Sequence, residues 1–155
     1  MSPGPLEEEE TLALFTFSVG AHSYAVDLRR VDEVLPPMEV TEAPGARAPV
    51  VGAVSLRGER VPVVELRQCL PVVDAPLGAR PGLLVCWLGR RKVGFLVDAV
   101  GAVAQVSTAS LLAPSAGAGV SPAVAAVWAQ PPGVHFLLDV KELLRGQSPP
   151  PPPTG

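Results

Sequence analysis

The segment LFTFSVGAHSYAVDL, residues 14–28, has a large apolar side chain at nearly every second position on both sides of Gly20. Alternate side chains of a β-strand point to opposite faces of its sheet, and glycine adopts the backbone angles of a tight turn without strain. This spacing therefore predicts a β-hairpin that turns at Gly20. A second segment, LVCWLGRRKVGFLVDAV at 84–100, has the same alternation and predicts a second hairpin.

The two hairpins resemble one another. Sliding residues 15–34 forward by 69 positions matches apolar with apolar side chains without a gap. Residues 50–54 match 123–127 at an offset of 73, which places Gln130 at the counterpart of Arg57. Further along, VVELRQCL matches LLDVKELL at an offset of 74, so one residue would be inserted at the turn. Blocks that recur in the same order at nearly one offset predict an internal duplication.

Short runs of valine and leucine are separated by glycine and proline along the rest of the chain, which is typical of an all-β barrel or sandwich. Two units of about 70 residues would each hide only about 60% of their unfolded surface. We therefore expect the two units to pack on each other and to leave a groove between them.

The ends of the chain differ from its middle. Residues 1–11 are acidic and residues 146–155 are rich in proline, so we expect both segments to be disordered. The folded domain is expected at 12–145. Its first barrel would span about 12–72 and its second about 82–145, with strand exchange between them left open.

Composition argues against several classes of partner. The chain is 48% apolar and 17% charged, with a formal net charge of -3, and its charges are interspersed, so no broad cationic surface for nucleic acid or anionic lipid is expected. Cys69 and Cys86 lack the spacing of metal ligands. Residues 99–138 contain no Lys, Arg, Asp or Glu, but glycine and proline interrupt them, so they predict no membrane-spanning helix. The acidic start is unlike a signal peptide, and we expect a cytoplasmic protein.

The segment GAVSLRGERVPVVELR, residues 52–67, places Arg57, Glu59 and Arg60 within an apolar sequence. In the second copy the turn reads AQPPGV, so the fold requires a turn at this place but not a charged one. Two interpretations follow from the residues alone. The charges are the solvated tip of a hairpin, or the guanidinium is mounted there to bind a partner with fixed geometry.

The ordered segments FTFSVGAHSYAVDLRRVDEVL, VVGAVSLRGERVPVVELR, VGFLVDAVGAV and FLLDVKELL together resemble the CheW family of bacterial chemotaxis adaptors. The run G-x-x-x-L-R-G-x-x-x-P-V-x-x-L-R from Gly52 to Arg67 is the most specific part of the resemblance, and VDAV at 97–100 is the second. The resemblance implies two packed SH3-like five-stranded β-barrels. It also implies a non-catalytic adaptor that joins the cytoplasmic tips of chemoreceptors to the regulatory domain of a CheA-type histidine kinase.

The resemblance also implies which residues contact these partners. The first barrel and the receptor-facing groove would contribute Val31, Glu33, Gly52, Arg57 and Gly58, and the second side of the groove would contribute Val100 and Val103. Alternating valines are usually core residues, and a glycine in a strand often only permits close approach of backbone. Ser55 departs from the family pattern, which has Asn before Leu-Arg-Gly.

Other functions remain to be weighed. His22 and His135 are the only histidines, and no metalloprotease, nucleophile-elbow, Walker or dinucleotide motif occurs, so we expect no catalysis, cofactor or metal. Asp27, Asp98 and Asp139 lie in or beside predicted strands, where salt-bridging or capping roles are commoner than acid–base chemistry. The alternative is a small β-barrel binding module for another partner, nucleic acid or peptide, outside chemotaxis. An oligonucleotide barrel would need a basic groove with exposed aromatic side chains.

Overall fold

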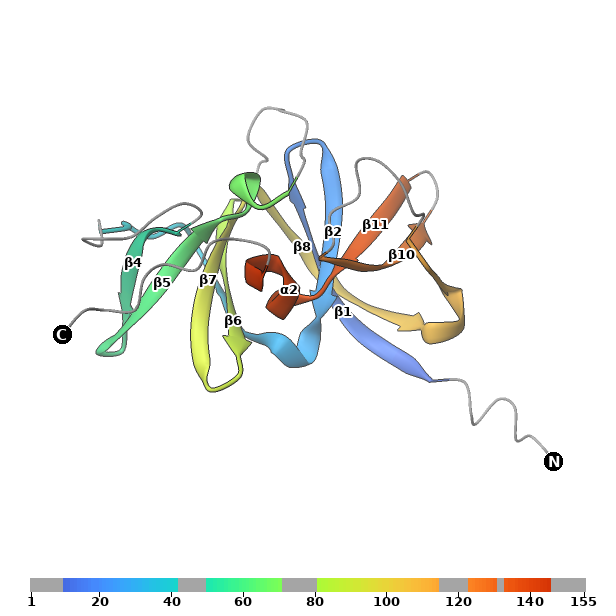
Figure 1. Cartoon of the computed structure of the whole chain (residues 1–155), viewed down its shortest axis with the longest axis horizontal. Helices are drawn as coiled ribbons and strands as arrows, with labels where there is room; N and C mark the ends of the chain where they lie inside the picture. Colours follow the sequence, from blue (N-terminus) through green and yellow to red (C-terminus); the bar gives the residue numbers. More distant parts are fainter. Residues whose placement is uncertain (1–9, 42–49, 71–80, 115–122, 131–132, 146–155) are drawn as a thin grey trace.

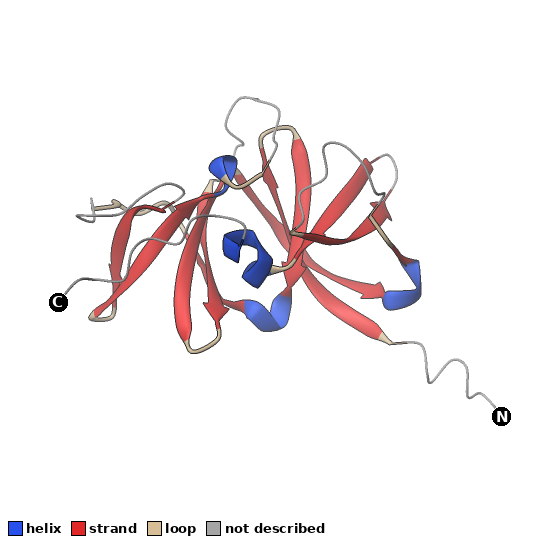
Figure 2. Cartoon of the chain, in the orientation of Figure 1, coloured by secondary structure: helices blue, strands red, loops and turns tan. Residues whose placement is uncertain are grey.

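The computed structural model describes residues 10–41, 50–70, 81–114, 123–130 and 133–145 of the chain. Strands make up most of these residues and form two sheets, with a short helix between them (Figures 1 and 2). Residues 1–9 and 146–155, which we expect to be disordered, lie outside the described residues. No helix in the described part of the chain is long and apolar enough to cross a membrane.

The six-stranded sheet has the order β8-β1-β2-β11-β10-β9. Its strands are β1 (Thr11–Val19), β2 (His22–Asp27), β8 (Ala99–Ser107), β9 (Leu111–Leu112), β10 (Val124–Gln130) and β11 (Gly133–Leu138). The five-stranded sheet has the order β3-β6-β7-β5-β4. Its strands are β3 (Val31–Leu35), β4 (Val50–Leu56), β5 (Glu59–Glu65), β6 (Gly82–Leu88) and β7 (Arg91–Val97). The helical segments are η1 (Leu28–Arg30), η2 (Leu66–Gln68), η3 (Thr108–Ser110) and α2 (Val140–Arg145).

The two hairpins predicted from the alternating pattern are confirmed. β1 and β2 pair antiparallel around Gly20, whose φ is 61°, and β6 and β7 pair antiparallel around Gly89, whose φ is 66°. These left-handed angles are the conformation that glycine adopts without strain. β1 begins at Thr11, and the carbonyl of Glu10 accepts a hydrogen bond from the amide of Thr108, so the ordered strand starts slightly earlier than we expected.

The two halves of the chain exchange their first hairpins. The β1-β2 hairpin of the first half joins the strands β8 to β11 of the second half, and the β6-β7 hairpin of the second half joins β3, β4 and β5. Each exchange is made through a parallel pairing, β2 with β11 and β7 with β5. The units that we expected at about 12–72 and 82–145 follow the order of the chain, whereas each sheet is built from both of them.

The register of strand pairing repeats between the two sheets and confirms the internal duplication. Phe17 pairs with Val100 in the six-stranded sheet, and Cys86 pairs with Val31 in the five-stranded sheet. Cys86 lies 69 positions after Phe17, and Val100 lies 69 positions after Val31, so the two pairs are related by the offset seen in the sequence. A β-bulge interrupts each of these two strand pairings at the corresponding place.

The expected insertion at the second turn is wrong, because the offset there is 74 throughout. The bulge that follows Val50 in β4 recurs after Val124 in β10, and both hairpin turns hold two residues. The counterpart of Arg57 is therefore Pro131 and not Gln130. Alanine and valine occupy both faces of these strands, so the two copies align equally well in sequence when one is shifted by a single residue. Only the turns and bulges of the structure fix the register.

Both sheets curl so that their edges meet. In the six-stranded sheet, β8 continues through η3 into β9, which pairs with β10. In the five-stranded sheet, the chain after β3 reaches β4 through an isolated bridge between Thr41 and Ala53. The described residues thus form the predicted all-β fold of two packed barrels. The six-stranded barrel has one strand more than expected, because the two residues of β9 pair as a separate strand.

Three apolar clusters stabilise the fold. The largest fills the space between the sheets and receives Val140 and Leu143 of α2, which lies between the sheets in Figure 1. A second cluster fills the five-stranded barrel and includes Val54, Leu56, Val61, Val63, Leu83 and Val85. The third fills the six-stranded barrel and includes Leu14, Ala25 and Val106. Each fully buried Leu or Phe side chain contributes about 1.5–3 kcal/mol, so the central cluster ties both sheets and α2 into one body.

Candidate partner-binding surface

The turn between β4 and β5 has an unusual backbone. Its two central residues both have positive φ angles, 47° at Arg57 and 82° at Gly58. This combination matches the twist of the flanking strands and makes a tight two-residue hairpin turn. Gly58 tolerates such an angle, whereas Arg57 carries a Cβ and is the non-glycine residue with a positive φ among the described residues. The turn therefore holds the Arg57 side chain at a defined place.

Arg57 has a partner within the chain. Its Nη1 and Nη2 atoms donate to the two carboxylate oxygens of Glu33, at 2.6 and 2.7 Å. Glu33 lies on β3, at the opposite edge of the five-stranded sheet, so this two-pronged ion pair joins the two edges of the sheet at the surface. The hydrogen bonds from Arg57 lower the pKa of the Glu33 carboxyl below its ordinary value. The Arg57 side chain is still 69% exposed and keeps N–H donors for a partner.

Further charges surround this pair. The Lys92 ammonium on β7 lies 3.4 Å from an Asp32 carboxylate oxygen and 3.8 Å from one of Glu59. The ammonium also lies 5.0 Å from the centre of the Trp87 ring, which is the geometry of a cation–π contact. We call Asp32, Glu33, Arg57, Glu59 and Lys92 the charged cluster.

The charged cluster belongs to one barrel only. The duplication offsets assign uncharged residues of the six-stranded barrel to each of its members: Gly101, Ala102, Pro131, Gly133 and Ser23. The fold is therefore built without these charges in one of its two copies. The first of our two interpretations was that these charges are only the solvated tip of a hairpin. Such a tip needs no carboxylate on another strand to fix its arginine, so the charged cluster is more ordered than that interpretation requires.

Gly52 is buried beneath the connection that follows β3. A Cβ at this position would overlap the carbonyl oxygen of Thr41 and lie 2.6 Å from Cγ1 of Val40. The bridge between Thr41 and Ala53 needs this close approach, and its two backbone hydrogen bonds measure 2.8 and 2.9 Å. Gly52 thus positions the strand that leads to the charged turn.

The predicted valines lie on both sheets. Val31 and Val100 occupy equivalent positions and pack against the apolar cluster between the sheets. Val103 lies on β8 opposite Phe15, and the residue is 53% exposed. The structure brings Glu33, Arg57 and Gly58 together on the five-stranded barrel, whereas Val100 and Val103 belong to the six-stranded barrel.

The most buried charge was not singled out as a site residue from the sequence. Asp98 is 7% exposed, and its carboxylate accepts hydrogen bonds from Nη2 of Arg67 and from the amide of Gly20, both at 2.5 Å. This carboxylate joins the β7–β8 junction, η2 and the β1–β2 turn. Asp98 lies in the VDAV motif at 97–100, and Arg67 ends the motif that begins at Gly52. No periodic pattern in the sequence indicates that two positions so far apart are in contact.

The capping and salt-bridging roles expected of the aspartates are confirmed. Asp27 accepts a hydrogen bond from the Arg29 amide at the start of η1, and Asp139 accepts one from the Lys141 amide at the start of α2. Within the described residues, no group of three His, Cys, Asp or Glu side chains could hold a metal ion. Burial raises the pKa of the Cys69 thiol to about 11 and that of Cys86 to about 12, so both thiols are poor nucleophiles.

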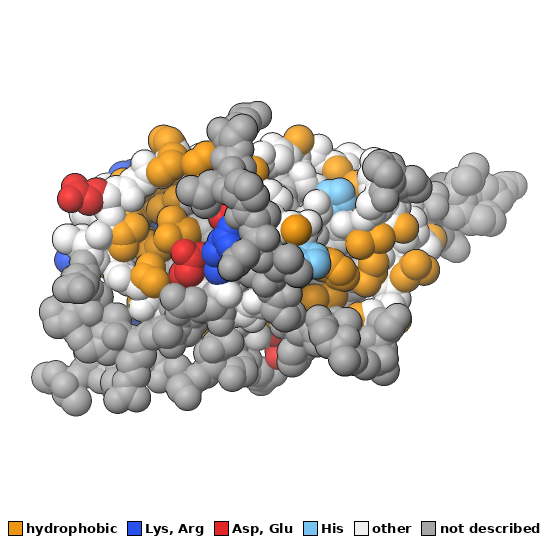
Figure 3. All heavy atoms as spheres, turned by 90° about the horizontal axis from the view of Figure 1, so that it is seen from above, with side chains coloured by type: hydrophobic (Ala, Val, Ile, Leu, Met, Phe, Trp, Pro, Cys, Tyr) orange, Lys and Arg blue, Asp and Glu red, His pale blue; other side chains and the backbone are white. Residues whose placement is uncertain are grey.

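Apolar side chains also reach the surface. Seen from above, they gather over both halves of the visible face, with acidic and basic side chains near the middle (Figure 3). Exposed apolar groups next to a few charges are the composition expected of a surface that binds another protein.

Sequence comparisons identify similar proteins. The family model described as CheW-like domain matches residues 13–148. The chain is 34% identical over 94 residues to Chemotaxis protein CheW of Rhizobium meliloti, a match that covers 61% of this chain and 61% of the relative. It is 31% identical over 103 residues to Protein FrzA of Myxococcus xanthus, covering 66% of this chain and 64% of the relative. The chain thus matches less than two thirds of the length of these relatives.

A solved structure has the same fold. The crystal structure of the scaffolding protein TtCheW from Thermoanaerobacter tengcongensis superposes with a TM-score of 0.81 and covers 91% of this chain and 97% of that one. The two sequences are 20% identical, so the likeness concerns the fold alone.

Proposed function

This chain belongs to the CheW-like family, and we propose that it is a non-catalytic adaptor that couples chemoreceptors to a CheA-type histidine kinase in a bacterial chemosensory signalling array. Relatives named as chemotaxis proteins and a structural neighbour described as a scaffolding protein support this proposal. The observation that carries it is the charged cluster, which is present on one of two equivalent barrels. None of the relatives named above favours the alternative of a nucleic-acid or peptide module outside chemotaxis.

Arg57 and Glu33 would form the polar part of the binding surface. Glu33 holds the guanidinium in one orientation, so less side-chain entropy is lost when a partner binds. The remaining N–H donors of Arg57 suit a carboxylate or a backbone carbonyl. Gly58 shapes the turn, and Gly52 holds the strand that carries it.

The valines would form the apolar part. Val103 exposes most of its side chain on β8, and Val31 and Val100 border the cluster between the sheets. An amphipathic helix of a partner fits a surface that offers apolar side chains beside charges. We infer a cytoplasmic protein that is recruited to membrane-associated receptor arrays without inserting into the membrane.

The test is the substitution Arg57→Ala, with affinities measured by isothermal titration calorimetry. The two ligands are a receptor-tip fragment and the regulatory domain of a CheA-type kinase from the same genome. We expect a loss of about tenfold or more for one ligand, because an arginine at an interface centre costs about 2 kcal/mol or more when truncated. Glu33→Gln should weaken the same interaction, since it frees the guanidinium.

Arg60→Ala is the matched control, because Arg60 is an exposed arginine of the same hairpin. It should bind both ligands like the wild type. Thermal melts of all variants should agree closely. If Arg57→Ala binds both ligands normally, the charged cluster is not the binding surface; if it melts far below the wild type, Arg57 acts on the fold instead.

A further inference from the structure

The two barrels differ in how one row of their interior is filled. In the six-stranded barrel, neighbouring strands bring four side chains into register: Trp128, His135, Ser23 and Ser18. Their counterparts in the five-stranded barrel are Val54, Val61, Lys92 and Trp87. Ser18 lies on the same face of β1 as Leu14, which belongs to the cluster inside the six-stranded barrel. Two serines therefore stand where the other copy has a lysine packed on a tryptophan.

The same difference extends to β8. Ala99 and Gly101 stand where the other copy has Arg30 and Asp32. Gly101 is required at its place, because a Cβ there would overlap the Thr16 side chain. The Thr16 hydroxyl accepts a hydrogen bond from the Ala102 amide at 3.0 Å and donates one to the Ala102 carbonyl at 3.1 Å. The bulge of β8 is thus fixed in a position that leaves this end of the barrel open.

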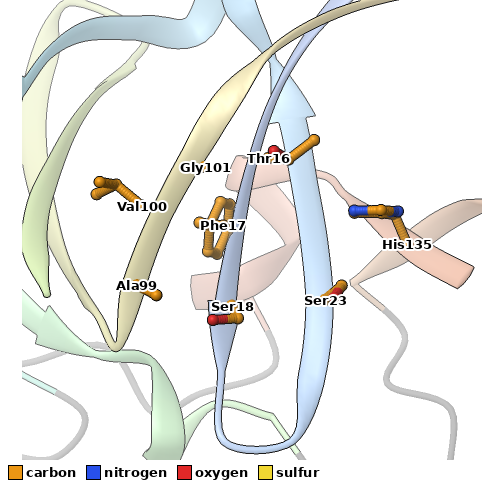
Figure 4. A pocket seen from close by; sticks show the side chains of 8 residues that line it. All are labelled: Thr16, Phe17, Ser18, Ser23, Ala99, Val100, Gly101 and His135. Carbon is orange, nitrogen blue, oxygen red and sulfur yellow. The ribbon is translucent and has the colours of Figure 1, made fainter. Parts of the chain in front are cut away.

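The missing side-chain volume leaves a pocket of about 210 Å³ (Figure 4). The polar side chains that line it are Thr16, Ser18, Ser23 and His135, and the rest of the lining comes from Phe17, Ala99, Val100 and Gly101. None of the described residues that line the pocket is charged. A cavity of about 150 Å³ is enough for a benzene molecule, so this pocket has room for one ring and a substituent.

The pocket contains unused hydrogen-bonding groups. Nδ1 of His135 is buried and has no hydrogen-bond partner among the described residues, and neither do the hydroxyls of Ser18 and Ser23. The Trp128 ring packs on the imidazole, with 5.1 Å between ring centres. Burial lowers the pKa of His135, so its imidazole is neutral at neutral pH. Buried polar atoms are nearly always paired in folded proteins, so an unpaired one on a residue that lines a pocket points to a ligand or to water.

We propose that this pocket binds one uncharged, ring-sized group that carries a hydrogen-bonding substituent, such as a phenol or a carboxamide. The ring would lie over Ala99 and Gly101 on β8, and the substituent would bond to His135 and the two serines. Such a group is either a free small molecule or the side chain of a partner. The site does not use the charged cluster, so its test does not depend on the adaptor function.

The experiment is a titration of the full chain, with its histidines labelled by ¹³C and ¹⁵N, followed by NMR. The chain has two histidines, and His22 does not line the pocket, so it serves as an internal reference. The probes are phenol and benzamide as free compounds, N-acetyltyrosinamide as a side-chain mimic, and benzoate as a charged counterpart. We expect the His135 signals to shift with saturation at concentrations of about 1–10 mM while those of His22 stay constant.

N-acetyltyrosinamide distinguishes the two sources of the group. Saturable binding of this probe would indicate a partner side chain, and binding of phenol or benzamide alone would indicate a free small molecule. Saturation by benzoate at the same concentrations as benzamide would overturn the proposal of an uncharged ligand. A response that is linear and equal at both histidines would leave only water in the pocket and would overturn the proposal entirely.

Three variants connect binding to this place. Ser23→Ala removes one hydroxyl and should weaken binding about fivefold, the usual effect of one lost hydrogen bond. Ser18→Leu fills the pocket and should abolish the saturable shift, with a melting temperature at or above that of the wild type. Ser55→Ala changes an exposed serine on β4 and should have no effect. If folded Ser18→Leu binds phenol like the wild type, the site lies elsewhere.

Discussion

Asp98 is the one buried charged side chain among the described residues. A carboxylate in such a place is stable only when its hydrogen-bonding capacity is used, and here Arg67 and the Gly20 amide use it. At the scale of single residues, this charge therefore serves the fold, whereas the exposed Arg57 leaves donors open to a partner. Both residues belong to the most specific motifs of the sequence, so a place in a motif does not by itself separate a structural from a binding role.

Asp98→Asn should lower the free energy of unfolding by about 3 kcal/mol, because it removes the charge of the buried carboxylate that accepts hydrogen bonds from Arg67 and from the Gly20 amide. Urea denaturation monitored by circular dichroism measures this. Arg29→Ala is the control, since Arg29 pairs with Asp27 while its side chain is 81% exposed, and its loss should not change stability measurably. Equal effects of the two substitutions would mean that Asp98 is not a structural link.

At the scale of the elements, the connection between β3 and β4 depends on Gly52. Gly52→Ala should lower the free energy of unfolding by about 1–3 kcal/mol, because the new methyl group overlaps the Thr41 carbonyl and forces the bridge to Ala53 apart. Thermal or urea denaturation measures the change.

Gly133→Ala is the comparison, because Gly133 begins β11 and a Cβ there meets nothing within 4 Å. It should change stability little. Unchanged stability of Gly52→Ala would show that the bridge is not needed to hold β4.

The elements also show what the sequence can predict. The hairpins followed from a period of two around Gly20 and Gly89, because the faces of a sheet and its turns depend on neighbouring residues. The offset of 74 between β4 and β10 could not be predicted in this way, because valine and alanine match equally well when the alignment is shifted by one residue. The pairing of Glu33 with Arg57 and the pocket beside His135 depend on which strands meet when a barrel closes, and that is set by contacts between residues far apart in the chain.

At the scale of the whole molecule, the exchange of hairpins makes each barrel dependent on both halves of the chain. A fragment that ends at 72 and a fragment that begins at 81 should each be largely unfolded in isolation, because each would lack strands of both sheets. Mixing the two should restore the β-sheet signal in circular dichroism and the dispersed amide signals in NMR. A cooperative melt of either fragment alone as a monomer would contradict this dependence.

The exchange also constrains how the two copies can evolve. Since every sheet contains strands from both copies, a substitution that shifts the backbone of one copy disturbs the other as well, and natural selection acts on both at once. Side chains at the open ends of the barrels are less constrained, because replacing them leaves the backbone pairing of the strands in place. After a gene duplication, divergence is therefore concentrated at these ends, where one barrel has acquired a set of charges and the other a hollow.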